Sequence, residues 1–130
     1  MGDAMRLRVH IWMEDHGETA MGMGRALLLA KIREHGSLRQ AAAEMRMSYR
    51  AAWGKLKATE ARLGTALVRK AKGQRFELTE EGERICDAFL TLHREVESFA
   101  SARAQNLLGI AVTCTASEEP SAPITAVPPK

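Results

Sequence analysis

Hydrophobic residues between residues 37 and 63 recur at helical spacing in two short runs, and each run begins with a serine. Ser37 and Ser48 can each accept a hydrogen bond from a backbone N–H of the first helical turn, and Gln40 gives the first run the spacing of a capping box. The inward positions of the two runs are Leu38, Ala41, Ala42 and Met45, followed by Ala52, Leu56, Thr59 and Leu63. Because only two residues separate the runs, the pattern predicts two helices that meet in a tight turn.

Small residues at the contact between these two helices favour a helix-turn-helix unit. Small side chains let two helix backbones approach closely, as this unit requires. They are Ala41, Ala42, Ala51 and Ala52. An ordinary helical hairpin is the alternative, because short connections between helices are common.

Strand patterns flank these helices on both sides. Residues 6–13 alternate apolar and polar side chains, which predicts a half-buried strand, and residues 18–20 can form a brief return strand. Its apolar face would consist of Leu7, Val9, Ile11 and Met13. Residues 24–35 form a predicted first helix that buries Leu28, Leu29 and Ile32 and ends at Gly36. Residues 66–78 predict two short strands around a basic tip.

A long amphipathic helix is predicted from about residue 79 to residue 107. Thr79 can cap it, and three glutamates in its first turn favour the helix dipole. Its length would be roughly 43 Å at 1.5 Å per residue, longer than the domain needs. Apolar side chains follow the 4-3-4-3 spacing of a helix that pairs with another at Ile85, Phe89, Leu92, Val96 and Phe99. This stripe predicts a homodimer, with packing onto its own domain as the alternative.

Together these elements predict a mainly α-helical fold with a small β-sheet, namely a winged helix-turn-helix with a long C-terminal dimerisation helix. The chain of 130 residues has room for one such domain, which we assign to residues 1–112. Residues 113–130 contain four prolines and no periodicity, so we expect a disordered tail there.

Charge is distributed unevenly along the chain. The formal net charge is only +3, but residues 25–75 hold 13 Lys and Arg against 3 Asp and Glu, a balance of +10, whereas the remainder holds 6 against 13, a balance of −7. A basic centre with acidic flanks indicates a surface that binds a polyanion, because a merely solvated surface would mix the signs. Double-stranded DNA is therefore the predicted partner.

The rest of the composition argues against several other classes of protein. Cys86 and Cys114 are too few for a zinc motif or a disulfide framework, so we expect a reducing cytoplasm. No apolar leader and no run of about 18 apolar residues is present, so we expect no membrane association. The four histidines and the GMGRA segment at 22–26 lack the spacing of known catalytic or nucleotide-binding motifs. We therefore expect no enzyme, no cofactor and no metal site.

The predicted recognition helix, residues 48–63, has a polar face opposite its apolar stripe. The candidate DNA-binding residues on it are Ser48, Tyr49, Arg50, Trp53, Gly54 and Lys57. Such a face enters the major groove, where Arg50 could contact O6 and N7 of a guanine. Ser48 and Tyr49 could donate to phosphates or bases, and Gly54 allows close approach of the backbone. Trp53 either joins this face or lies on the helix pair as partial core.

Basic residues outside this helix extend the predicted DNA surface. In the predicted wing, residues 69–75, Lys70, Lys72 and Arg75 could contact the flanking backbone or minor groove, although a wing can also be a solubilising loop. Arg39 and Arg46 could contact the backbone where the first helix of the unit crosses it. These residues should bind DNA without distinguishing its sequence.

Two families share these motifs. Residues 36–70, GSLRQAAAEMRMSYRAAWGKLKATEARLGTALVRK, followed by LTEEGE, resemble the DNA-binding domain of LysR-type regulators. SYRAAW, together with the predicted N-terminal strand, is similar to the N-terminal domain of molybdate-responsive ModE-type regulators. The resemblance covers roughly residues 5–107. It implies a homodimeric, cytoplasmic, bacterial transcriptional regulator.

Members of both families usually carry a ligand-binding domain as well. SARAQNLLGIAV at residues 101–112 is similar to the start of the molybdate-binding domain of ModE-type regulators, but the residues that follow are too few for a small β-barrel. We therefore expect a DNA-binding module without a small-molecule effector site. Two alternatives stay open: a winged-helix module that binds another protein, and a sensor of a small molecule such as molybdate at the dimer seam.

Overall fold

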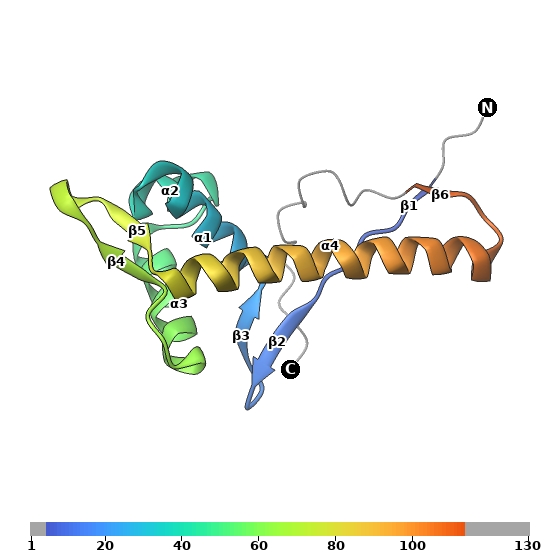
Figure 1. Ribbon diagram of the computed structural model, residues 1–130, viewed down its shortest axis with the longest axis horizontal. Helices are drawn as coiled ribbons and strands as arrows, with labels where there is room; N and C mark the ends of the chain where they lie inside the picture. Colours follow the sequence, from blue (N-terminus) through green and yellow to red (C-terminus); the bar gives the residue numbers. More distant parts are fainter. Residues whose placement is uncertain (1–4, 114–130) are drawn as a thin grey trace.

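Four helices and three two-stranded sheets make up residues 5–113, the part of the chain that this computed structural model describes (Figure 1). The helices are α1 (Met23–His35), α2 (Leu38–Glu44), α3 (Tyr49–Leu63) and α4 (Glu80–Leu108). The strands are β1 (Met5–Arg6), β2 (Trp12–Asp15), β3 (Glu18–Gly22), β4 (Val68–Lys70), β5 (Phe76–Leu78) and β6 (Val112–Thr113). This order confirms the predicted winged helix-turn-helix with a long C-terminal helix.

The helix-turn-helix unit, α2 and α3, forms as its two serines predict. Ser37 Oγ accepts a hydrogen bond from the backbone N–H of Gln40, and Ser48 Oγ accepts one from that of Ala51, each at 3.0 Å. Between the helices Arg46 has a φ of 58°, in the left-handed region that non-glycine residues rarely adopt. This residue lets the chain change direction within a few residues, so α3 starts directly beside α2.

Helix α1 occupies the centre of the hydrophobic core, since it packs against α2, β5 and α4. The side chains predicted to point inward from α1, α2 and α3 are buried or partly buried. Burial of one leucine or isoleucine side chain contributes about 1.5–3 kcal/mol. The largest members of the core from these helices are Leu28, Leu29, Ile32, Leu38 and Leu56. This core fixes the position of α3 relative to α1.

The wing comprises β4, a 3-10 turn (Lys72–Gln74) and β5; one hydrogen bond closes its base, and another joins β5 to the end of α1. The carbonyl oxygen of Leu67 accepts from the N–H of Thr79 at 2.9 Å, and that of Gly36 accepts from the N–H of Phe76 at 3.0 Å. A Cβ on Gly82 would collide with the carbonyl oxygen of Leu67, so only glycine lets α4 begin this close to the wing.

The predicted continuous strand over residues 6–13 is wrong. Only its two ends form strands: β1 pairs in parallel with β6, and β2 pairs with β3 in the predicted hairpin. The residues between them bond to side chains of α4 instead, with the N–H of Val9 donating to Glu97 Oε2 and the carbonyl of Val9 3.1 Å from His93 Nε2. Met13, predicted inward, is 54% exposed beside a register shift in the hairpin.

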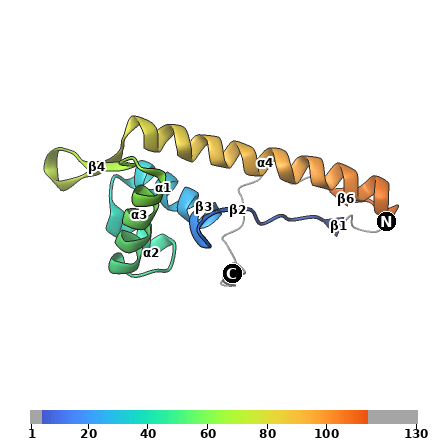
Figure 2. The same ribbon diagram turned by 90° about the horizontal axis from the view of Figure 1, so that it is seen from below.

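Helix α4 matches its predicted bounds closely, and its C-terminal half extends well beyond α1–α3 (Figures 1 and 2). The residues it buries against its own chain are Gly82, Cys86, Phe89, His93, Glu97, Ser101 and Ala104. Of the predicted dimerisation stripe, Phe89 joins the chain's own core, whereas Leu92 is 44% exposed and Phe99 69% exposed. The predicted tail, 113–130, lies outside the described residues except for Thr113, which pairs in β6.

Candidate nucleic-acid interface

The N-terminal half of α3 exposes the side chains predicted to bind DNA. Ser48, Arg50 and Gly54 are exposed, while Ala52 and Leu56 on the opposite face of the helix are buried. The α3 stripe thus lies against α1 and α2, and the polar face of α3 lies on the surface. Within residues 5–113 the Arg50 side chain has no hydrogen bond or ion pair, so it can reach a ligand at no cost in internal contacts.

Two aromatic side chains of α3 each lie under a cation. The Arg39 guanidinium is 4.6 Å from the centroid of the Tyr49 ring, and Lys57 Nζ is 4.6 Å from that of the Trp53 ring. Such contacts orient the cations and are worth about 0.5–1 kcal/mol at exposed sites. They connect α2 to the start of α3 and restrict Lys57 to the surface around Trp53.

Trp53 lies partly on the exposed face of α3 and partly against the core, so it combines the two roles that its sequence position suggested. Its side chain is 36% exposed, and its ring centroid is 6.1 Å from that of Phe76 with an interplanar angle of 59°. Phe76 is a core residue of β5 in the wing. Trp53 therefore packs on the base of the wing and leaves one side open beside Lys57.

The wing carries exposed cations at and near its tip. Lys70, Lys72 and Arg75 are exposed, and none of them has a carboxylate partner in the described part of the chain. Arg69 differs, because its Nε donates to Glu77 Oε2 across the hairpin at 2.6 Å. The Arg75 guanidinium lies over Gly36, so it is held near the turn that precedes α2.

Ion pairing divides the 13 cations of residues 25–75 into two groups. Five have a carboxylate within 4.0 Å: Lys31, Arg33, Lys57, Arg62 and Arg69. The remaining eight (13 − 5) have none among the described residues: Arg25, Arg39, Arg46, Arg50, Lys55, Lys70, Lys72 and Arg75. All of the eight except Arg25 are exposed on α2, the turn after it, α3 or the wing. Figures 1 and 2 show these elements together at one end of the molecule.

Glu60 has a structural role that sequence reasoning missed. Its Oε2 accepts from the backbone N–H of Leu67 at 2.7 Å and of Val68 at 3.3 Å, and its Oε1 pairs with Lys57 Nζ at 3.1 Å. Burial alone would raise the pKa of this carboxyl, but the Leu67 N–H and the Lys57 ammonium outweigh it and lower the pKa. Glu60 thereby ties the wing to α3. Its spacing from Lys57 was visible in the sequence, but the seven-residue reach to Leu67 was not.

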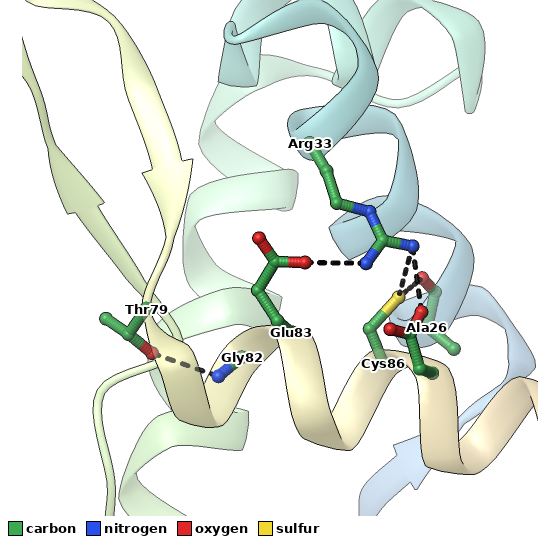
Figure 3. A network of polar contacts seen from close by, with 7 residues as sticks. Ala26, Arg33, Thr79, Gly82, Glu83 and Cys86 are labelled. Carbon is green, nitrogen blue, oxygen red and sulfur yellow. Dashed lines mark hydrogen bonds and ion pairs between the residues drawn. The ribbon is translucent and has the colours of Figure 1, made fainter.

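A polar network fixes α4 against α1, as Figure 3 shows. Arg33 on α1 donates to Glu83 Oε1 at 2.7 Å and to Asp87 Oδ1 at 2.9 Å, and these hydrogen bonds, that of Asp87 first, raise the pKa of Arg33. The buried Cys86 thiol, which lies between Glu83 and Asp87 in the sequence of α4, donates to the carbonyl oxygen of Ala26 on α1 at 3.5 Å. The start of α4 is therefore fixed relative to the helix-turn-helix unit.

Comparisons with known proteins agree with this geometry. Residues 25–83, from α1 to the first turn of α4, match the model of the family described as bacterial regulatory helix-turn-helix protein, lysR family. The matched segment resembles the helix-turn-helix domain of LysR-type regulators. The match supports a DNA-binding transcriptional regulator and agrees with the LysR-type part of the predicted resemblance. No curated protein matches the chain.

The winged helix-turn-helix fold also has a counterpart among solved structures. The chain is similar to the crystal structure of a CbnR DNA-binding domain in complex with DNA, with a TM-score of 0.53 and 20% sequence identity. The similarity covers 65% of this chain and 94% of that chain. At this identity it establishes the winged fold. In residues 5–113 no helix combines the length and the apolar character that a membrane span requires.

Proposed function

We propose that this regulator binds double-stranded DNA as a cytoplasmic homodimer, with α3 in the major groove and the wing on the flanking backbone or minor groove. The observation that carries the proposal is a group of seven exposed cations on α2, the turn after it, α3 and the wing, none of which has a carboxylate partner within residues 5–113. Cations that no carboxylate neutralises are available to phosphates, and each phosphate contact releases counterions from DNA.

Sequence-specific contacts are assigned to the start of α3. Arg50 is exposed in the first turn of α3 and has no partner within residues 5–113, which suits bidentate contact with guanine O6 and N7. Ser48, Tyr49 and Gly54 lie at the same end of α3 and suit phosphate contact or close approach. Arg39, Arg46, Lys70, Lys72 and Arg75 would contact phosphates and bind every sequence alike.

The proposed dimer uses the exposed apolar side chains of α4. Leu92 and Phe99 are exposed large hydrophobic residues, with Ile85 and Val96 partly buried beside them. At 100° per residue this stripe lies roughly a quarter turn around α4 from the face that packs on the chain itself. Apolar side chains left on such a helix favour pairing with the same helix of a second copy.

Selection of bound sequences from a random pool of DNA duplexes tests the function. We expect two related half-sites about 34 Å apart. We also expect the logarithm of the association constant to fall linearly with the logarithm of the salt concentration, with a slope of about −0.9 per phosphate contacted. Equal affinity for every sequence would contradict the proposal. Size-exclusion chromatography with light scattering tests the dimer separately. A monomer without DNA affinity at low salt would favour the protein-binding alternative.

The ModE-type resemblance is a finer proposal, supported by SYRAAW in α3 and the β2–β3 hairpin before α1. It leads to the proposal that this chain senses molybdate at the dimer seam. Calorimetry with molybdate and the full chain addresses this directly, and an absence of heat would remove the idea.

A further inference from the structure

Arg39, in the first turn of α2, is held by an aromatic ring and not by a carboxylate. Its guanidinium lies 4.6 Å from the centroid of the Tyr49 ring, and within residues 5–113 it has no ion pair. An arginine side chain on the surface samples many rotamers and loses this freedom when it binds a phosphate. A contact that fixes the side chain beforehand lowers that cost, so the ring can prepare Arg39 for a ligand.

The backbone of Tyr49 is fixed relative to α2, because it is the first residue of α3. On one side Ser48 caps the helix by accepting from the N–H of Ala51, and in the preceding turn the N–H of Met47 donates to the carbonyl of Ala42 at 3.0 Å. Helix α3 also packs directly on α2. The Tyr49 side chain is 38% exposed and has only two rotatable bonds, so its ring is a well-placed support for a surface cation.

The ring of Tyr49 makes this contact, and its hydroxyl does not. A cation is attracted to the negative face of an aromatic ring, and phenylalanine provides such a face too. Within residues 5–113 the Tyr49 hydroxyl has no hydrogen bond. Removal of the hydroxyl should therefore leave Arg39 in place, whereas removal of the ring should release it.

Lys57 and Trp53 make the same kind of contact with a different balance of charge. Lys57 Nζ lies 4.6 Å from the centroid of the Trp53 ring and 3.1 Å from Glu60 Oε1. The Glu60 carboxylate offsets the charge of Lys57, whereas no carboxylate in residues 5–113 offsets that of Arg39. Of these two cations held by rings, Arg39 therefore keeps its full charge for a phosphate.

We propose that Tyr49 is a positioning residue for DNA binding, whose ring holds the Arg39 guanidinium ready for a backbone phosphate beside the start of α3. This inference rests on the proposed function. It assigns to the Tyr49 ring the contribution that the sequence had suggested for the hydroxyl. Because the phosphate binds Arg39 and not the ring, loss of the ring should weaken binding without removing a phosphate contact.

A double-mutant cycle on duplex binding by the full chain tests this role. Arg39→Gln should reduce the slope of log affinity against log salt by about 0.9, because it removes a phosphate contact. Tyr49→Leu should lower affinity by about two- to fivefold at an unchanged slope, the size of an exposed cation–ring contact. In the Arg39→Gln background Tyr49→Leu should have no further effect, since the cation that the ring holds is absent. Tyr49→Phe should bind like the parent.

Two controls complete the experiment. Arg94→Gln removes an exposed arginine of α4, outside the proposed DNA surface, and should leave affinity and slope nearly unchanged. In the free parent protein the Tyr49 ring current should shift the side-chain proton resonances of Arg39, and this measurement keeps the contact testable even if Tyr49→Leu fails to fold.

Three results would overturn the role of Tyr49 while the parent still binds DNA. They are an equal effect of Tyr49→Leu with and without Arg39, a loss with Tyr49→Phe as large as that with Tyr49→Leu, and an absence of the ring-current shift. A parent that shows the shift but binds no duplex would instead overturn the proposed function, and the role of Tyr49 with it.

Discussion

The guanidinium of Arg75 in the wing lies over the α-carbon of Gly36, in the space that a side chain on Gly36 would occupy. Gly36 also has a φ of 66° as the residue that ends α1, and its carbonyl accepts from the N–H of Phe76. Glycine at this position thus allows the left-handed end of α1 and also leaves room for the Arg75 guanidinium. The relationship couples the wing to the turn before α2, on the proposed DNA surface.

Replacement of Gly36 separates these two roles. Gly36→Ala should cost about 1 kcal/mol of unfolding free energy from its left-handed backbone, and Gly64→Ala, at a φ of 72° with open space around it, should cost about the same. Only Gly36→Ala should also weaken DNA binding, because it displaces the Arg75 guanidinium. Chemical denaturation and DNA titration of both variants check this. Equal DNA affinities of the two variants would indicate that Arg75 does not contact DNA.

Glu60 should make the stability of the wing depend on acid. Its pKa in the folded chain lies below the ordinary 4.5, so its contribution is complete above about that pH and is lost as pH falls through the lowered value. Glu60→Gln should therefore cost about 1 kcal/mol at pH 7 and progressively less toward pH 3. Denaturation across pH measures this. Glu34→Gln, on an exposed carboxylate, is the control and should change little at either pH.

Sequence patterns predicted the elements whose stabilising contacts are local. Ser37, Ser48 and Thr79 each accept a backbone hydrogen bond three residues ahead, and their spacing is visible in the sequence. The strand predicted over residues 6–13 failed because alternation shows which side chains share a face and not which partner bonds the backbone. There the partners are Glu97 and His93, more than 80 residues away.

The sequence predicted that the candidate interface is rich in cations, but not which of these cations form ion pairs. The excess of +10 in residues 25–75 indicated a polyanion surface. The sequence could not show that Arg33 and Arg69 pair with Glu83 and Glu77, while Arg50 has no such partner among residues 5–113. Such pairing is decided by how the helices and the wing strands pack.

The thiol of Cys86 should resist alkylation while the protein is folded. It is fully buried between α1 and α4, and burial raises its pKa to about 11, so little thiolate exists at pH 8. In a Cys114→Ser background, iodoacetamide should label Cys86 at least about 100-fold more slowly than in denaturant. Arg33→Ala should speed the labelling, because it removes the hydrogen bonds to Glu83 and Asp87. Rapid labelling of the folded parent would contradict the described packing of α4.

Arg50 and Lys72 should have different effects on DNA binding. Arg50→Ala should relax base preference at one position of each half-site, at a cost of about 1–3 kcal/mol for the preferred base. Lys72→Ala should weaken all sequences alike and reduce the salt slope by about 0.9. Competition binding with operator and scrambled duplexes distinguishes the two. Uniform loss with Arg50→Ala would assign this residue to phosphate contact instead.

Phe99 provides the sharpest test of the proposed dimer, because it is 69% exposed in the single chain. Because most of this side chain is exposed, Phe99→Glu should leave the unfolding free energy of the monomer nearly unchanged. If two α4 helices pair through this stripe, the variant buries a charge at their seam and should raise the dimer dissociation constant by about tenfold or more. Thr91→Glu adds the same charge at an exposed α4 position roughly a third of a turn from the stripe and should leave dimerisation intact. Light scattering across a dilution series measures both variants, and equal dissociation constants would place the dimer contact elsewhere.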